Sequence, residues 1–424
     1  MSYKPAGLLG AIALLALQGI TAADEVFTKT AVIAVPGGLN SFDIGFVDPQ
    51  LGLYFLADRT NKTIDQVVTS TNAISQLAPG AFVGVQSGTD TSGPNGVITA
   101  NNHTEIWAGD GVLCSGPCGA TTPATQTSRV QVINIATGKL THTIDLKGQR
   151  RADELCEDPQ HHLVLIANDD DLDLFLTFID TKSYSVVGTI KLDGTDPNGQ
   201  KIKATNGIEQ CQWSPRTNKF YLAVPEVNGA GQPGAVLEIN PASMKVQKVF
   251  TIPVADCVGP QGLAIGPGRQ ILLGCSNRGP GSVIIDELDG SVVHNLPGLN
   301  GNDEVWYNPG DNQYFLAGSN HCNLIPCPTP NLPPILGVVD PDGNIDTSTT
   351  TAAGSHSVAA DPVKNQVYVP GNKAATTLCG GSNGCIAVFT ATGDDAGICV
   401  AQGAPVIAMA GGEPGFLRSV CPPR

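Results

Sequence analysis

The segment GIEQCQWSP (residues 207–215), followed by KFYLAVPE (residues 219–226), decides the fold because variants of this pair recur along the chain. The first segment is a short, largely apolar strand with a polar residue near its start, and it usually ends in Asp-Pro, Ser-Pro or Asn-Pro. A turn and a strand rich in aromatic and β-branched residues follow in most copies. The seven copies of the first segment are SFDIGFVDP (41–49), GPNGVITAN (93–101), RADELCEDP (151–159), GIEQCQWSP (207–215), GPQGLAIGP (259–267), NDEVWYNP (302–309) and SHSVAADP (355–362).

Each repeat continues with a third strand, a turn and a fourth strand, as in RVQVINIATGKLTHTIDL (129–146). Four strands in a unit of roughly 40–60 residues is the period of a propeller blade. The sequence therefore predicts an all-β, seven-bladed β-propeller with four antiparallel strands per blade. Six or eight blades stay open, because residues 299–354 and the C-terminal residues fit the pattern less clearly. The strand at 29–35 precedes the first repeat and is expected to complete the last blade.

The ends of the chain are predicted to lie outside the propeller. Lys4, the apolar run 8–17 and the small residues Thr21-Ala22-Ala23 have the pattern of a secretory signal peptide. We expect a signal peptide over 1–23, a propeller domain over 24–398, and a C-terminal segment over 399–424 tied back by a disulfide. The predicted location is extracellular, or periplasmic in a bacterium. No later stretch has the ~20 apolar residues of a membrane helix.

The cysteines agree with an oxidising compartment, since all twelve follow the predicted signal peptide. Their order suggests pairing between neighbours, although sequence alone cannot fix connectivity. A thiolate metal cluster is the rival interpretation, disfavoured because no C-x-x-C pair is present. The suggested pairs are Cys114–Cys118, Cys156–Cys211, Cys257–Cys275, Cys322–Cys327, Cys379–Cys385 and Cys399–Cys421. Asn61 and Asn102 begin glycosylation sequons, which are used only in a eukaryotic host.

The charge balance is acidic, with 23 Lys and Arg against 38 Asp and Glu. This balance argues against nucleic acid and anionic membranes as partners, because both bind basic patches. A closed ring of blades needs no partner to cover its sheet edges, so the expected state is a monomer.

Alignment of the seven copies on their final Pro, or its equivalent, places a polar residue six positions earlier in every copy. The first strand of a propeller blade lines the central channel, so these residues are expected to form a ring at one mouth. The ring consists of Asp43, Asn95, Asp153, Glu209, Gln261, Asp303 and His356. Glu154 and Glu304 follow two ring residues directly, but adjacent strand residues face opposite sides.

The second strand of each blade returns to the same mouth, and its end also carries polar residues. They are Asp58, Asp110, Asp169, Glu226, Asn277, His321 and Asn372. Two polar layers predict an acidic funnel. Several close carboxylates stay ionised only if a cation or protons compensate them, and Ca²⁺ held by oxygen ligands is one such cation.

The Asp-Pro repeats and the strand–turn–strand text around "IDTKSYSVVGTI" resemble the YncE-like and NHL/SMP-30-type propellers over essentially the whole predicted mature chain. The resemblance to SMP-30-like lactonases implies one divalent metal ion, most readily Ca²⁺, held by a Glu, an Asn and an Asp. By residue type the metal ligands would be Glu209 and Asn95 with Asp153 or Asp303. The chain departs from that family in blade number and in lacking a clear early Glu ligand.

These features suggest an enzyme, and a lactonase or esterase that acts on a small organic substrate is the leading hypothesis. In that hypothesis a metal polarises the carbonyl, while a carboxylate or His356 handles the proton on water. The catalytic candidates are His356, Asp303 and Asp43, and the substrate-binding candidates are Gln261, His321, Asp110 and Asp169. Two alternatives stay open: a metal-free lyase, isomerase or cyclase using His356 with Asp303 or Asp43, and a non-catalytic binding propeller.

Three other motifs are given structural interpretations. Residues 380–384 match G-x-S-x-G but lie in a loop between two cysteines, where the strand and helix of a nucleophile elbow are absent. The acidic run 168–173 lacks the Gly and Glu of a calcium loop. Trp107, Trp213 and Trp306 are assigned to the blade core.

Overall fold

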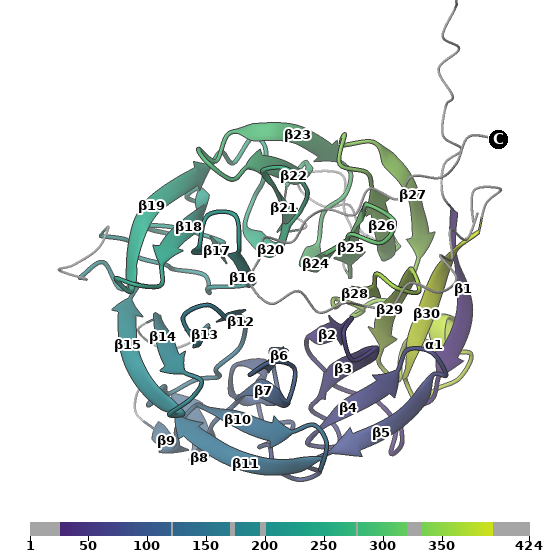
Figure 1. Cartoon of the computed structure of the whole chain (residues 1–424), viewed down its shortest axis with the longest axis horizontal. Coiled ribbons are helices and arrows are strands. Elements are labelled where there is room, and N and C mark those ends of the chain that lie inside the picture. Colours follow the sequence, from purple (N-terminus) through teal and green to yellow (C-terminus); the bar gives the residue numbers. More distant parts are fainter. Residues whose placement is uncertain are drawn as a thin grey trace, which may run out of the picture.

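The chain forms a ring of seven four-stranded antiparallel sheets in a computed structural model, as the repeats predict (Figure 1). The structure describes residues 26–119, 122–169, 174–195, 201–276, 279–319 and 333–392. The predicted signal peptide and the C-terminal segment lie outside these residues. Among the described residues no helix is long and apolar enough to cross a membrane.

The first four blades follow one another along the chain, each with its first-named strand nearest the channel. Blade 1 consists of β2 (Gly45–Asp48), β3 (Leu53–Asp58), β4 (Thr63–Val68) and β5 (Ala73–Leu77). Blade 2 consists of β6 (Val97–Ala100), β7 (Glu105–Asp110), β10 (Arg129–Asn134) and β11 (Lys139–Asp145). Blade 3 consists of β12 (Leu155–Asp158), β13 (Leu163–Asn168), β14 (Phe175–Asp180) and β15 (Ser185–Lys191). Blade 4 consists of β16 (Cys211–Ser214), β17 (Lys219–Val224), β18 (Gly234–Asn240) and β19 (Lys245–Ile252).

The last three blades complete the ring. Blade 5 consists of β20 (Pro260–Ile265), β21 (Gln270–Cys275), β22 (Gly281–Asp286) and β23 (Val292–Pro297). Blade 6 consists of β24 (Asn302–Asn308), β25 (Gln313–Gly318), β26 (Ile335–Val339) and β27 (Ile345–Thr350). Blade 7 consists of β28 (Ala359–Asp361), β29 (Gln366–Gly371), β30 (Cys385–Thr392) and the N-terminal strand β1 (Val26–Ile33).

The N-terminal strand closes the ring, because β1 pairs antiparallel with β30 and becomes the outermost strand of blade 7. Blade 7 also packs against blade 1: the buried rings of Tyr54 and Tyr368 stack with their centroids 4.7 Å apart. This arrangement confirms the position that the sequence predicts for the first strand.

The recurrent Asp-Pro pairs form the turns between first and second strands. The carboxylates of Asp48, Asp158 and Asp361 each accept hydrogen bonds from the backbone N–H groups two and three residues further on, over 2.8–3.3 Å. An Asp side chain that bonds the following backbone in this way stabilises a tight turn, and the Pro presets its φ. The repeated dipeptide is therefore a turn signal on the face away from the predicted mouth.

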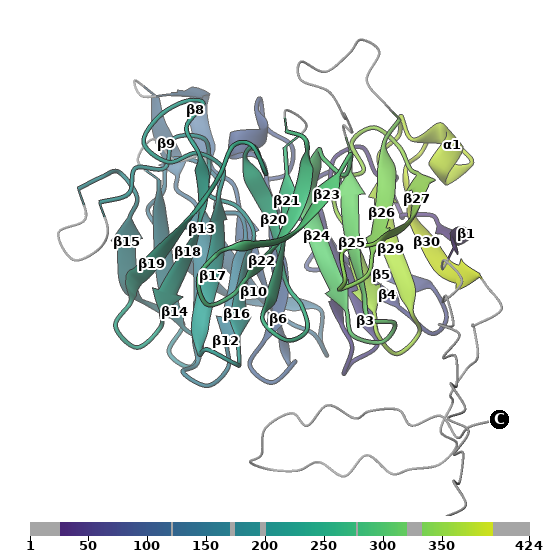
Figure 2. The same cartoon turned by 90° about the horizontal axis from the view of Figure 1, so that it is seen from above.

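Two further elements of secondary structure lie in connections between the second and third strands of a blade. The hairpin of β8 (Leu113–Gly119) and β9 (Thr122–Gln126) follows β7, and the short helix α1 (Thr376–Cys379) follows β29. Both lie on the same face of the ring in Figure 2. This is the mouth face, since every second strand ends there. Residues 380–384 follow α1 directly, so their G-x-S-x-G spacing lies in a loop.

Three of the predicted disulfides are present: Cys156–Cys211, Cys257–Cys275 and Cys379–Cys385. The first joins the innermost strands of blades 3 and 4. The other three predicted pairs include cysteines whose side chains lie outside the described residues. Three disulfides are compatible with an extracellular protein.

Candidate functional site

The seven aligned polar residues stand at the entrance of the channel, at or just before the first strand of each blade. The backbone N–H groups of Asp43, Asn95, Asp153 and Glu209 each donate to the carbonyl fourteen residues further on, at the end of the second strand, over 2.9–3.0 Å. This shared hydrogen bond fixes the four positions equivalently. The ring that the alignment predicts is therefore a real geometric feature of the mouth.

Two arginines that the sequence analysis did not single out neutralise part of this ring: Arg59 is buried, and the side chain of Arg151 is 15 % exposed. Arg59 is 3 % exposed and lies just beyond β3. Its guanidinium is ion-paired with Asp43 and donates two hydrogen bonds to the amide oxygen of Asn95, at 3.0 and 2.6 Å. The Asn95 amide nitrogen donates to the carbonyl of Ala152 at 2.7 Å. Arg59 therefore ties the ring residues of blades 1 and 2 together.

Arg151 similarly ties two acidic residues of blade 3 together. Its Nε lies 2.8 Å from Asp153 Oδ2, and its terminal nitrogen lies 2.8 Å from Asp169 Oδ2. Asp169 also accepts the backbone N–H of Ile208 at 2.8 Å, which anchors the segment before Glu209. A guanidinium that bridges two buried carboxylates compensates both charges.

His356 is the third cation of the mouth. Its Nδ1 lies 2.9 Å from the carbonyl of Gly354 and its Nε2 lies 3.3 Å from Asp43 Oδ1, so both ring nitrogens face acceptors. Burial alone would lower the pKa of His356, but the hydrogen bond to Asp43 and the charge of Asp303 raise it to about 9. His356 is therefore an imidazolium at neutral pH, and it cannot act there as a general base.

Asp43 is held in its ionised form by its neighbours. Burial opposes ionisation, but the charge of Arg59 and the hydrogen bond from His356 hold the pKa of Asp43 well below its usual range. Asp43 thus compensates two cations and has little capacity to exchange a proton near neutral pH.

Two carboxyl groups of the ring remain outside these ion pairs. In the described part of the chain neither Glu209 nor Asp303 forms a salt bridge, and Asp303 accepts a hydrogen bond only from Gln261, at 3.1 Å. Burial first, and then the charges of Asp169 and Asp303, raise the pKa of Glu209 well above its usual value. Burial also raises the pKa of Asp303, despite the opposing charge of His356.

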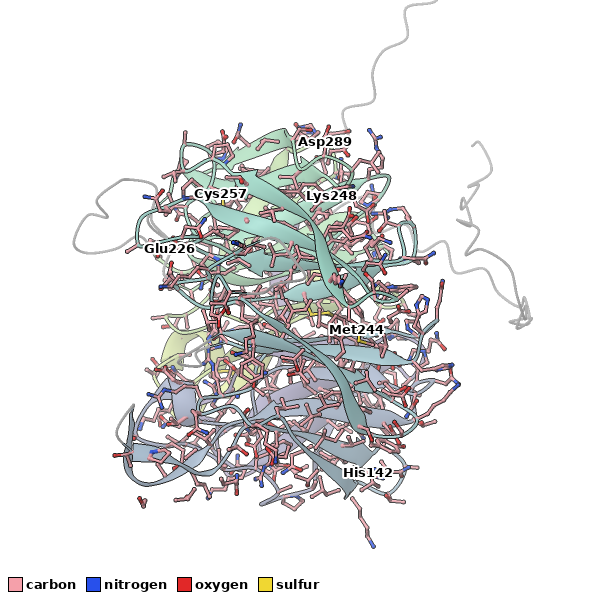
Figure 3. The ribbon with its side chains drawn as sticks, turned by 90° about the vertical axis from the view of Figure 1, so that its left-hand side faces the viewer. His142, Glu226, Met244, Lys248, Cys257 and Asp289 are labelled. Carbon is pink, nitrogen blue, oxygen red and sulfur yellow. A yellow bond between two sulfur atoms is a disulfide. The ribbon has the colours of Figure 1, made fainter. Side chains whose placement is uncertain are left out.

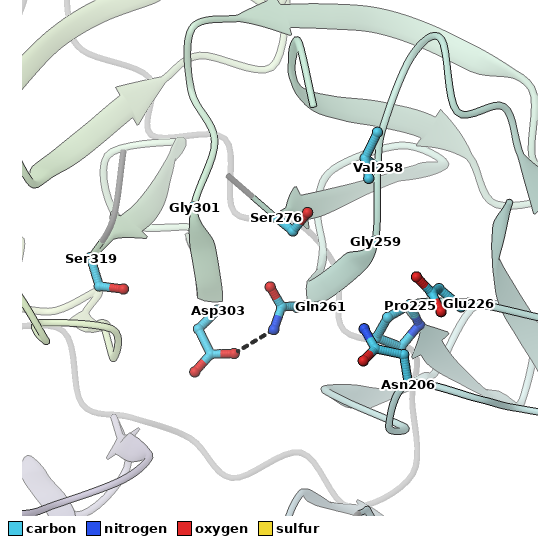
Figure 4. A pocket seen from close by; sticks show the side chains of 10 residues that line it. All are labelled: Asn206, Pro225, Glu226, Val258, Gly259, Gln261, Ser276, Gly301, Asp303 and Ser319. Carbon is cyan, nitrogen blue, oxygen red and sulfur yellow. Dashed lines mark hydrogen bonds between the residues drawn. The ribbon is translucent and has the colours of Figure 1, made fainter. Parts of the chain in front are cut away.

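These two carboxyl groups border two adjoining hollows that share Asn206 and Gln261. One hollow, of about 390 Å³, is also lined by Arg151, Asp169 and Glu209. The other, of about 310 Å³, is also lined by Asp303, Glu226, Ser276 and Ser319 (Figure 4). Figure 4 shows Gln261 between Asp303 and Asn206, with its amide turned toward the carboxyl of Asp303. The mouth thus offers two adjoining polar hollows with four carboxyl groups and one guanidinium on their walls, and Arg151 pairs with one of those carboxyl groups, Asp169.

The polar residues at the ends of the second strands contribute less to the walls of the mouth than the sequence predicts. Asp110 is fully buried, where it accepts from Arg129 and from the backbone of Val83, so it supports a loop. Asp58 is also fully buried, and its carboxylate accepts a hydrogen bond from the side-chain amide of Asn61. Asp169 and Glu226 do line the mouth. Asn372 accepts the backbone N–H of Ala374. Asn277 and His321 lie outside the described residues, as does most of the acidic run 168–173.

Two of the predicted metal ligands already have other partners in this structure. The oxygen of Asn95 already accepts two hydrogen bonds from Arg59, and Asp153 is paired with Arg151. Among the described residues no three His, Cys, Asp or Glu side chains are grouped so that they could hold a metal ion. A cation placed between Glu209, Asn95 and Asp153 would face two guanidinium groups, whose like charge disfavours binding.

Comparisons with known proteins give information about the fold of this chain but not about its activity. No family model matches the sequence, and no curated protein matches it either. The solved structures it resembles include "Crystal Structure of Mitotic Checkpoint Complex", at 11 % identity and a TM-score of 0.58 over 91 % of this chain and 100 % of that chain. The chain has a WD40-like propeller fold.

Two further structures support this assignment. The RRP9 WD40 repeats match at 8 % identity and a TM-score of 0.59 over 85 % of this chain and 97 % of theirs. The Pan2 WD40 domain of Neurospora crassa matches at 11 % identity and a TM-score of 0.54 over 87 % and 96 %. Identities this low establish the architecture alone, so the resemblance to YncE-like and NHL/SMP-30-type propellers stays a resemblance.

The buried titratable groups predict that this WD40-like propeller is more stable at acidic than at alkaline pH. His356 is protonated more readily when folded, so its contribution, about 3 kcal/mol at most, is complete below pH 6.5 and is lost as pH rises through about 9. Glu209 and Glu304 also have a raised pKa because of burial, and they act in the same direction from about pH 4.5 upward. We expect the Tm, followed by circular dichroism, to fall by several degrees from pH 5.5 to pH 9.

The variant His356→Gln serves as the control. It should flatten the part of this profile between pH 6.5 and 9, because the titration of the imidazole is removed. A Tm that rises between pH 5.5 and 9 in the native protein would contradict the assignment.

Proposed function

We propose that the protein is an extracellular, metal-independent hydrolase that acts on a small lactone or ester bound at the channel mouth. The observation that carries the proposal is the pair Glu209 and Asp303, two carboxyl groups with raised pKa that line two adjoining polar hollows, one in each. The neighbouring carboxylates Asp43 and Asp153 have dedicated arginine partners. Carboxyl groups left unpaired where they meet a cavity are poised to exchange protons with a ligand.

In the proposed reaction, Asp303, Arg151 and Glu209 each have a separate role. Ionised Asp303 accepts a proton from water as the water oxygen forms a bond to the carbonyl carbon. The negative charge that develops on the carbonyl oxygen is stabilised by Arg151, which lines the hollow beside Glu209. When the bond to the leaving oxygen breaks, protonated Glu209, whose pKa is the more strongly raised of the two, donates its proton to that oxygen. Solvent then returns the proton from Asp303 to Glu209, and the site is restored.

Asp43 and His356 act one step away from the reacting atoms. They form an ion pair that holds Asp303 in the field of the imidazolium, so they are positioning residues in this proposal. Gln261 orients Asp303 through its 3.1 Å hydrogen bond.

The test measures hydrolysis of glucono-δ-lactone and 4-nitrophenyl acetate by pH-stat in the presence of EDTA. Turnover should survive the chelator, and Glu209→Gln and Asp303→Asn should each lower kcat/KM by roughly 100-fold or more, because general acid–base catalysis contributes 10²–10⁴-fold. Asp289→Asn is the matched control on the opposite face, where the carboxylate of Asp289 accepts a turn hydrogen bond from the backbone N–H of Ser291.

Two outcomes would overturn the proposal: full activity in both variants, or activity that appears only when a divalent metal is added back to the chelated protein. The second outcome, with one equivalent of bound metal lost in Glu209→Ala, would support the metal-dependent lactonase that the sequence resemblance implies.

A non-catalytic binding propeller is the second candidate. The observation that favours it is the placement of the β8–β9 hairpin and α1 together on the mouth face (Figure 2). One of the similar structures is itself part of a complex, the mitotic checkpoint complex. No turnover of either substrate, together with sensitivity of a captured partner to changes in the hairpin, would favour this function.

A further inference from the structure

The opposite half of the central channel contains a second cavity, of about 420 Å³, which shares no lining residue with the hollows of the mouth. Its walls are mainly apolar and come from the first strands of blades 1, 2, 3, 4 and 6. The half-buried rings of Phe46, Trp213 and Trp306 face it. Trp213 and Trp306 were expected in the blade core, where only Trp107 is fully buried.

Two buried glutamates also line this cavity, and they differ in their partners. Glu304 is 1 % exposed, and its Oε2 accepts from the hydroxyl of Ser357 and from the backbone N–H of Val358. Glu154 is 7 % exposed, and no described residue donates a hydrogen bond to its carboxyl group. Gln210, on the same wall, is fully engaged with backbone groups of Leu263 and Val305. Glu157, which also lines the cavity, accepts the backbone N–H of Asn101 at 3.0 Å. Among the described residues, Glu154 is therefore the carboxyl group of this cavity that is left for a ligand.

The charge of the cavity selects the kind of ligand. Its lining contains no Lys or Arg, and His103 at its edge is already engaged with Asp48. A carboxyl group that is nine-tenths buried without a partner requires either a proton or an incoming cation. Aromatic faces beside it attract organic cations and favour their apolar parts. An anion would meet the three carboxyl groups of Glu154, Glu157 and Glu304, and a metal ion would meet mainly apolar walls.

We propose that this cavity binds an apolar organic ammonium ion, whose charged nitrogen contacts Glu154 while its hydrocarbon part packs between Trp213 and Trp306. The volume lies within the range of small-molecule sites, and the pattern of apolar walls with one or two placed polar groups is typical of them. The inference does not depend on the hydrolase proposed for the mouth, because the two sites share no lining residue.

The experiment uses three probes that carry the same phenyl group and differ in charge: 3-phenylpropylamine, 3-phenylpropan-1-ol and 4-phenylbutanoate. Two of the three tryptophans of the chain line the cavity, so intrinsic fluorescence reports binding, and calorimetry gives the Kd. We expect the amine to bind at least 10-fold more tightly than the alcohol, and the carboxylate not to bind.

Glu154→Gln keeps the side-chain shape and should weaken the amine by roughly 10- to 100-fold, while its affinity for the alcohol stays the same. Glu226→Gln makes the same chemical change at the mouth and should leave amine binding unaltered. Trp213→Phe should lower the amine affinity and reduce the fluorescence response.

Equal binding of the amine by the native protein and Glu154→Gln would overturn the proposal. So would equal binding of the three probes, or no binding of the amine up to its solubility. Because all readouts are binding equilibria, they stand whether or not the mouth catalyses hydrolysis.

Discussion

Arg59→Met should lower the free energy of unfolding by about 3–5 kcal/mol, the largest effect we expect from a single substitution in this protein. The guanidinium of Arg59 is buried and compensates Asp43, whose other partner is His356 at 3.3 Å. Methionine fills similar space but leaves a buried carboxylate undercompensated and removes two donors from Asn95. Urea unfolding followed by tryptophan fluorescence measures the loss.

The double variant Arg59→Met with Asp43→Asn separates charge from packing. If the uncompensated carboxylate is the cause, the double variant should be more stable than Arg59→Met alone, with a coupling of about 1–3 kcal/mol between the two sites. Lys147→Met removes the cation of an exposed ion pair with Asp145 and should change stability by less than about 1 kcal/mol. A loss for Arg59→Met as small as for Lys147→Met would show that Asp43 needs no buried cation.

Removal of the disulfide Cys156–Cys211 should destabilise the protein by about 4 kcal/mol, because the bond closes a segment of 55 residues in the unfolded chain. The pair joins β12 to β16 beside the channel, so its loss also loosens the contact between blades 3 and 4. The double variant Cys156→Ala with Cys211→Ala tests this expectation by guanidinium unfolding.

The disulfide Cys379–Cys385 is the matched control, since its sequence separation is only 6 residues. The chain-entropy model expects about 2 kcal/mol for it, roughly half the effect of the longer loop. Equal losses for the two pairs, or a larger loss for the short one, would show that chain entropy is not the main contribution.

The architecture could be predicted from the sequence because the information is repeated seven times. A polar residue six positions before each turn Pro, or its equivalent, places the ring, and the Asp of each Asp-Pro pair caps its own turn. Even the incomplete first repeat predicted correctly that the N-terminal strand completes the last blade. Local signals of this kind do not depend on distant side chains.

The charge state of the mouth could not be predicted in the same way. Arg59 and Arg151 lie just outside the aligned ring positions, one after Asp58 and the other two residues before Asp153. Only Arg278, which follows Asn277, stands at a position equivalent to Arg59, and no other copy has an Arg at the position of Arg151. Their long side chains reach ring residues from neighbouring strands, and that reach depends on the blade geometry. An Arg beside a ring carboxylate, in a chain with only 23 basic residues, was the available signal.

The second cavity was missed for a related reason. Trp213 and Trp306 have the strand positions of core residues, and only the packing of five neighbouring blades shows that they border a space. Glu154 and Glu304 were noted as neighbours of the ring, but the sequence could not show that one of them lacks a partner. Such differences between equivalent positions arise from contacts between blades.

The closure of blade 7 by β1 has a consequence for biosynthesis. The partner strand β30 is among the last described segments, so β1 must wait for nearly the whole chain to be translated, which takes tens of seconds at roughly 5–20 residues per second. During this interval β1 is an unpaired β-segment that could pair with another nascent chain. Lys29 in the middle of β1 opposes such pairing, because a charged side chain on an unpaired strand disfavours its association with another strand. In the finished ring the same ammonium group donates to the carbonyl of Leu378 at 2.6 Å, so one lysine first protects the nascent strand and later fastens the closed propeller.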